Sequence, residues 1–321
     1  MHIPDGVLDP GTCLATGAVS AAVVGYALRR VRIDLPERTV PLMGVTAACV
    51  FAAQMLNFPV PGGTSGHILG GVLVGVMLGP WAGILTMAVV LAVQCLLFQD
   101  GGLTALGANV LNMAIVGAGV GYAIYDLARR AVGGLRGVVV GATLAAWFSV
   151  MISATLCSIE LAVGGQFQLS TTLSAMLLAH APVGVGEALA TGLALGYVIR
   201  VRPDLVYGGP RDARLPARAS QVLVVGLMFA LLMAAVVSPF ASSLPDGLEG
   251  SLAQLGFTTG AAGPVLPAPL PDYEISGWEG FAAAGALAGV IGTLVVFVLT
   301  FMLARYWPRR HDPAHVHAPA D

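Results

Sequence analysis

Long apolar runs without charged residues dominate this chain and limit what it can fold into. Hydrophobic residues make up 57% of the sequence and charged residues 10%, whereas a soluble domain carries about 25% charge. Runs of this length are typical of helices that satisfy their own backbone hydrogen bonds inside a lipid bilayer. The sequence therefore predicts an all-α, multi-pass integral membrane protein.

We predict nine membrane-spanning segments from these runs. The third, residues 67–79, is too short to cross a bilayer straight, which favours a broken or re-entrant segment that lines a cavity inside the protein. The other segments are predicted at 11–28, 39–56, 80–98, 104–126, 137–161, 172–198, 219–240 and 279–303.

The basic residues predict the orientation. All 15 are arginines, and they fall in four clusters that follow the first, fifth, seventh and ninth predicted segments. Nine spans place the four clusters on one side, which the positive-inside rule makes cytoplasmic, with the N-terminus outside the cell's inner (plasma) membrane. Acidic residues prevail on the outer side. This acidic excess either attracts cations or only reflects the exclusion of arginine from the outer loops.

One stretch divides the chain into two membrane modules. Residues 201–218 are rich in arginine and proline, which predicts a cytoplasmic linker. It separates a seven-span domain, 1–200, from a two-span module, 219–303, that carries a long outer loop at about 241–277. The tail, 304–321, holds three histidines. We expect a solvated tail rather than a weak metal site.

The first two residues, Met1 and His2, offer three adjacent nitrogens: the α-amine, the His2 peptide nitrogen and the His2 imidazole. Together they can chelate one divalent cation, and four nitrogens in a plane favour Ni(II) or Cu(II). His67, in a glycine-rich loop, is a candidate for the fourth nitrogen. The residues at the start lack the basic region of a secretory signal, so Met1 is expected to be retained. The alternative is an incidental N-terminus and an ordinary loop histidine.

Polar residues inside the predicted spans are further candidates. Asn109 and Asn112 are three positions apart, and His180 and Glu187 are seven apart, so each pair is expected to share a helix face. His180 and Glu187 either relay protons, orient metal ligands, or form a hydrogen-bonded pair that fastens two helices.

Several enzyme classes are excluded by missing motifs. Without lysine there is no GxxxxGK[ST] phosphate loop, so the chain cannot itself be a P-loop ATPase. It also lacks HExxH, GxSxG and paired catalytic carboxylates. We expect no enzymatic activity, no cofactor and no nucleic-acid partner. A self-sufficient secondary transporter or channel for divalent metals, using Glu187 and His180 for protons, remains an alternative to a transporter subunit.

Residues 1 to about 200 resemble the CbiM/NikM family, the substrate-binding membrane components of energy-coupling-factor transporters for cobalt or nickel. The resemblance rests on motifs spread over several segments: 1–6 (MHIPDG), 61–67 (PGGTSGH), 79–82 (GPWA), 107–113 (GANVLNM) and 180–187.

This resemblance implies a Ni²⁺ or Co²⁺ ion held by the Met1 amine, the backbone and side chain of His2, and His67. It also implies a transmembrane coupling component and two cytoplasmic ATPase subunits as partners. Residues 219–303, with the sequence PDGLE at 245–249, resemble the small accessory component of the same systems, here fused to the first.

Overall fold

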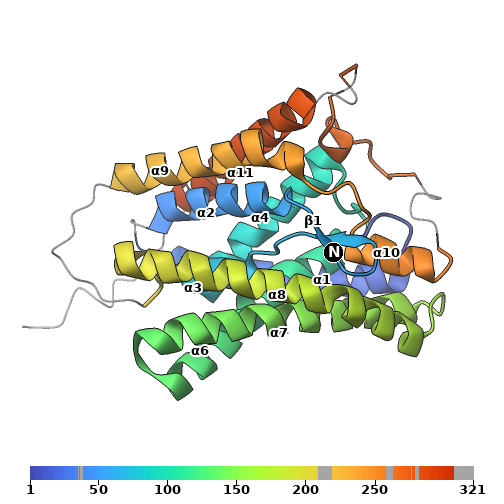
Figure 1. Cartoon of the computed structure of the whole chain (residues 1–321), viewed down its shortest axis with the longest axis horizontal. Coiled ribbons are helices and arrows are strands. Elements are labelled where there is room, and N and C mark those ends of the chain that lie inside the picture. Colours follow the sequence, from blue (N-terminus) through green and yellow to red (C-terminus); the bar gives the residue numbers. More distant parts are fainter. Residues whose placement is uncertain are drawn as a thin grey trace, which may run out of the picture.

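A computed structural model describes residues 1–34, 36, 39–208, 219–257, 263–275, 277–278 and 282–306. Its helices lie side by side along the long axis of the molecule (Figure 1). Within the described part, seven helical stretches are long and apolar enough to cross a membrane. The prediction of an all-α membrane protein is confirmed. These stretches are Pro10–Val31, Pro80–Phe98, Leu106–Val132, Gly134–Val163, Leu169–Val201, Gln221–Phe240 and Ala283–Tyr306.

The first module holds five of these stretches and two shorter helices, rather than seven similar spans. Its helices are α1 (Pro10–Asp34), α2 (Thr39–Gln54), α3 (Gly71–Leu78), α4 (Pro80–Phe98), α5 (Leu106–Asn109), the π-helix η1 (Val110–Val120), α6 (Gly121–Val132), α7 (Gly134–Val163) and α8 (Leu169–Val201). The short helices are α2, with 16 residues, and α3, with 8.

The third predicted span is broken in the structure. Its chain enters through a hairpin of β1 (Phe58–Val60) and β2 (Thr64–Gly66), runs extended past His67, and only then forms α3. Gly70 and Gly79, with φ angles of 73° and 83°, bound this helix in conformations that other residues rarely adopt. The extended part, which carries His67, is buried inside the bundle, where lipid cannot reach its backbone.

The second module packs directly on the first. Its elements are α9 (Ala219–Leu232), η3 (Met233–Val237), η4 (Ser238–Phe240), α10 (Gly247–Gln254), η5 (Pro271–Tyr273) and α11 (Ala282–Tyr306), preceded by η2 (Pro203–Leu205). Helices α9 and α11 lie against α2 (Figure 1). Glycines permit the close approach: a Cβ on Gly292 would lie 2.2 Å from the Phe51 ring.

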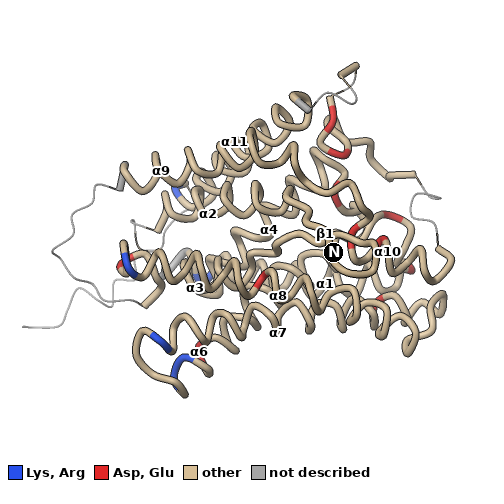
Figure 2. The backbone as a smooth tube through the Cα atoms, viewed as in Figure 1, with Lys and Arg blue, Asp and Glu red and all other residues tan. Residues whose placement is uncertain are grey.

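The charges lie at opposite ends of the bundle. Figure 2 shows the described arginines at one end, and most of the described acidic residues at the other, near the N-terminus and α10. Three predicted features lie outside the described residues: residues 209–218 of the linker, the tail from 307 onwards with its three histidines, and the acidic residue Glu279.

Candidate metal site

The N-terminus is buried at the acidic end of the bundle. Met1, His2 and Ile3 are 2%, 8% and 0% exposed. The side chain of Asn109 fixes this segment: its Oδ1 accepts from the Ile3 amide at 2.8 Å, and its Nδ2 donates to the Ile3 carbonyl at 3.1 Å. The Gly102 amide donates to the same carbonyl at 2.8 Å. Backbone contacts therefore hold the residue that follows His2 in one place.

The α-amine of Met1 lies 2.9 Å from His67 Nε2, which brings together two residues 66 positions apart. The His67 Nδ1 lies 3.2 Å from the Ile68 carbonyl oxygen. Because a carbonyl oxygen only accepts, this contact assigns the ring proton to Nδ1 and leaves the Nε2 lone pair facing the amine. Burial, followed by the nearby charge of the amine, lowers the pKa of His67 to about 3. The ring is therefore neutral, as a metal ligand must be.

His2 completes the cluster of nitrogens. Its ring stacks on that of His67, with centroids 5.2 Å apart and an interplanar angle of 20°. Its Nδ1 lies 2.9 Å from Asp100 Oδ1, and its Nε2 lies 3.2 Å from Gln94 Oε1. Both ring nitrogens of His2 are thus engaged by protein oxygens.

Two carboxylates hold the nitrogens of the N-terminus. Asp246 Oδ2 accepts a hydrogen bond from the Met1 amine at 2.8 Å. Asp100 Oδ1 is the corresponding partner of His2 Nδ1. Burial raises the pKa of each carboxyl, but the contacts of Asp100 with His2 and Tyr273, and of Asp246 with the Met1 amine, outweigh it, so the pKa of both lies well below its usual range. Both groups are therefore anionic.

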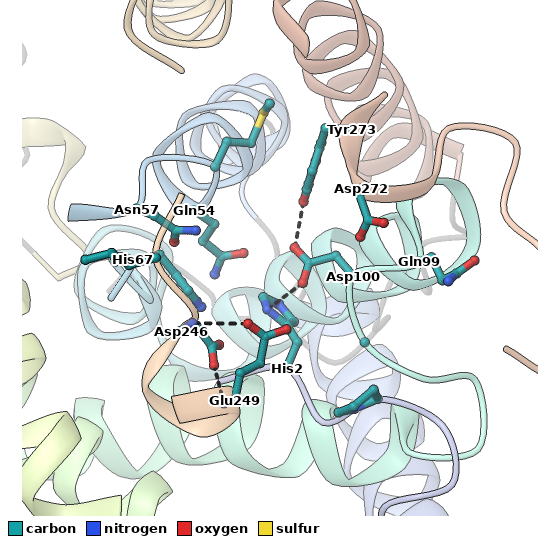
Figure 3. A pocket seen from close by; sticks show the side chains of 14 residues that line it. His2, Gln54, Asn57, His67, Gln99, Asp100, Asp246, Glu249, Asp272 and Tyr273 are labelled. Carbon is teal, nitrogen blue, oxygen red and sulfur yellow. Dashed lines mark hydrogen bonds and ion pairs between the residues drawn. The ribbon is translucent and has the colours of Figure 1, made fainter. Parts of the chain in front are cut away.

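A polar cavity of about 290 Å³ is lined by His2, His67, Asp100 and Asp246 (Figure 3). Gln94 Nε2 donates to Gln54 Oε1 at 2.8 Å, and Gln54 Nε2 donates to the Leu69 carbonyl at 2.7 Å, so two glutamines link His2 to the loop of His67. Within the described ranges, no three His, Cys, Asp or Glu side chains form a group that could hold a metal ion.

His180 and Glu187 do not bond to each other in the structure. The Glu187 carboxylate accepts from the amides of Leu69 and Gly70, at 2.7 and 2.8 Å, and so fixes the segment that carries His67. The His180 Nδ1 donates to the Met176 carbonyl one turn earlier, at 2.8 Å. His180 also lines a water-sized void together with Met1, His67 and Asp246.

Asn109 and Asn112 have separate roles. Asn109 holds the N-terminal segment, whereas Asn112 Nδ2 donates to Glu160 Oε2 on α7 at 2.7 Å. The wider turns of the π-helix η1, which begins at Val110, rotate the two side chains apart. Asn112 thus fastens two helices rather than contacting the candidate ligands.

Sequence reasoning missed Gln54 and Gln94, although uncharged polar residues inside apolar runs are a usable signal for them. Asp100 and Asp246 belong to the acidic residues expected on the outer side, but no contact of either with Met1 or His2 was predicted, and Tyr273 had no predicted role. The four cysteines are free thiols, and none lines the cavity.

The fold and the nitrogen-lined cavity define a class, that of multi-pass helical membrane proteins with a buried polar site at one end of the bundle. The chain belongs to the CbiM family: the family described as "cobalt uptake substrate-specific transmembrane region" matches residues 2–205. A PDGLE domain matches residues 220–309. The resemblance seen in the sequence is confirmed.

Similar proteins cover both modules. A putative fused nickel transport protein NikMN of Archaeoglobus fulgidus is 38% identical over 95% of this chain and 99% of its own length. A cobalt transport protein CbiM of Sorangium cellulosum is 34% identical over 64% of this chain and 94% of its own. The crystal structure of a truncated transition metal transporter superposes with a TM-score of 0.57, at 35% identity, covering 62% of this chain and 99% of that one.

Proposed function

We propose that this chain is the metal-capturing membrane subunit of an energy-coupling-factor importer for Ni²⁺ or Co²⁺. The observation that carries the proposal is the 2.9 Å approach of the Met1 amine to His67 Nε2 beside the stacked His2 ring. The similar proteins bear the names of nickel and cobalt transport proteins, which supports this cargo.

The ion would be held by four nitrogens: the Met1 amine, the His2 peptide nitrogen, the His2 imidazole and His67 Nε2. Loading requires the amine to leave Asp246 and the His2 ring to release at least one of its present partners, Asp100 and Gln94. A divalent cation then takes the place of the positive charge of the Met1 amine beside Asp246. The metal is cargo, and the subunit needs no cofactor.

Transport energy would come from separate subunits. The chain has no lysine and hence no phosphate loop, so we propose a transmembrane coupling component and two cytoplasmic ATPases as partners. The arginine-rich end would face the cytoplasm and the N-terminus the outside of the inner membrane. Residues 1–200 would form the metal-binding domain, 201–218 the linker, 219–303 the PDGLE-type accessory module and 304–321 the tail.

The alternative, a self-sufficient transporter or channel that relays protons through His180 and Glu187, gains no support from their contacts. Glu187 is engaged by two backbone amides and His180 by a carbonyl of its own helix. Expression of the chain alone, in cells without other nickel or cobalt importers, separates the two functions. We expect little uptake; robust uptake that an uncoupler abolishes and ATP depletion spares would favour the alternative.

The free N-terminus is the sharpest test of the binding site. A few residues added before Met1 would convert its amine to a peptide nitrogen and displace it from the cavity. We expect the purified variant to lose most of its retained Ni²⁺ or Co²⁺. Unchanged stoichiometry and affinity would contradict the assignment of the amine as a ligand.

A further inference from the structure

Tyr273, in the outer loop of the accessory module, stands between two cavities. The inner cavity, about 290 Å³, contains His2 and His67. The outer cavity, about 560 Å³, is lined by the accessory module, including Ser238, Glu274 and Trp278. Three residues line both cavities: Met55, Asp272 and Tyr273. The two cavities therefore adjoin at these residues, and the direct route from the outer cavity into the inner one runs past the Tyr273 side chain.

A hydrogen bond to Asp100 connects this side chain to the candidate metal ligand His2. The Tyr273 hydroxyl donates to Asp100 Oδ2 at 2.7 Å, while Asp100 Oδ1 lies 2.9 Å from His2 Nδ1 (Figure 3). The tyrosine ring stacks on Phe98, with centroids 4.6 Å apart and an interplanar angle of 16°. The ring is thus a plug that packs against α4, held on its polar side by the carboxylate that pairs with His2.

The backbone of this plug is strained. Asp272 and Tyr273 have φ angles of 53° and 60°, in the left-handed region that residues with a side chain rarely occupy. Such strain persists only where surrounding contacts impose it. Here they include the Tyr273–Asp100 bond, the stacking on Phe98 and the bond from the Leu270 amide to the Leu97 carbonyl, 3.0 Å. Loss of the hydroxyl contact removes one of the contacts that keep the segment in this conformation.

We propose that Tyr273 is the gate through which a hydrated divalent cation passes from the outer cavity to His2 and His67, an inference that rests on the proposed function. A cation near Asp272 and Glu274 competes with the tyrosine hydroxyl for Asp100. The ring then leaves Phe98, the strained backbone relaxes, and the inner cavity opens. Because the gate lies on the path and is not a ligand, it sets the rates of loading and release and leaves the equilibrium affinity unchanged.

The test measures the rates at which the purified full-length chain binds and releases Ni²⁺, together with its equilibrium retention of Ni²⁺. Tyr273→Phe keeps the ring and removes the hydroxyl, and Tyr273→Ala removes the plug. We expect both rates to rise in each variant, on the order of tenfold for Tyr273→Phe, which loses one hydrogen bond to a charged group, and further for Tyr273→Ala. Tyr207→Phe, on the far side of the bundle against Gly79, is the matched control and should leave both rates unchanged.

Rates equal to those of the wild type in both variants would overturn the gate. So would a loss of equilibrium retention in a Tyr273→Ala variant that melts like the wild type, because Tyr273 would then support the ligands themselves. If Tyr273→Ala fails to fold, the rates of Tyr273→Phe decide. Failure of the wild-type chain to retain Ni²⁺ would overturn the proposed function, and the gate with it.

Discussion

The α-amine of Met1 and the carboxylate of Asp246 form an ion pair at 2.8 Å, although 245 positions separate them in the chain. Asp246 belongs to the second module, where its Oδ1 also caps α10 by accepting from the amides of Leu248 and Glu249. The segment before α10 is anchored too: the Ser65 amide and hydroxyl donate to the carbonyls of Pro245 and Leu244, at 2.8 and 2.7 Å. The second module is therefore part of the wall of the candidate site.

Alanine substitutions should rank the candidate ligands. His2→Ala and His67→Ala each remove a nitrogen from the proposed set, so we expect large losses of Ni²⁺ and Co²⁺ affinity in equilibrium dialysis. His180→Ala removes a side chain that only borders the site, and we expect a smaller loss, within the roughly 10–100-fold range of groups that support ligands. An equal loss for His180→Ala would make His180 a ligand.

Asp246→Asn should separate the stability of the empty site from its capture of metal. Asparagine keeps the cap of α10 but leaves the buried amine without its counter-charge, so the empty protein should lose roughly 1–3 kcal/mol of stability. Metal affinity should be kept or increased, because the cation no longer competes with the ion pair.

Thermal unfolding with and without Ni²⁺ measures both effects of Asp246→Asn, and Asp126→Asn, at the arginine-rich end, is the control. A variant that melts like the wild type but no longer retains Ni²⁺ would show that Asp246 is itself a ligand.

The stability of the empty protein should fall as the pH falls below 6.5. His67 has a folded-state pKa lowered from 6.5 to about 3, so between these values the unfolded chain binds a proton that the folded chain excludes. The stabilisation is complete above pH 6.5 and is lost as the pH falls towards 3. Asp100 and Asp246, whose pKa values are also lowered, add a loss that begins near their ordinary value of 3.8.

Melting temperatures of the metal-free protein between pH 7 and 4 measure this effect. In His67→Gln, the decline from pH 6.5 should be shallower than in the wild type, because the neutral amide does not titrate. Parallel curves for the two proteins would show that His67 is not the group responsible.

Deletion of residues 244–277, with a short bridge between α9 and α11, tests what the outer loop contributes. The deletion removes Asp246, Glu249, Asp272, Tyr273 and Glu274 but leaves His2 and His67 in the first module. Because the loop is tethered beside the candidate site, it acts there at high effective concentration, and we expect it to help load the metal. We therefore predict that the deletion reduces cellular uptake by the assembled transporter but preserves metal retention by the isolated chain. If both survive, the loop is dispensable; if both vanish while the fold is intact, the loop supplies ligands.

Features that depend only on neighbours along the chain could be predicted from the amino-acid sequence. Uncharged apolar runs permit only helices in a bilayer, so the helical membrane class could be read directly. The adjacent amine, peptide nitrogen and imidazole of Met1-His2 form a candidate chelate wherever they lie in the fold. The shortness of 67–79 likewise indicated a broken span, since too few residues were available to cross.

Which distant groups meet depends on how the helices pack. Asp246, Asp100 and Gln94 lie far apart in the chain, and their approach to the N-terminus depends on how α4 and the accessory module pack. His180 and Glu187 share the spacing of a pair, yet Glu187 bonds to the backbone before α3, because helix spacing fixes the direction of a side chain but not its partner. A buried charge needs a counter-charge or hydrogen bonds, and only the packed bundle determines which residue supplies them.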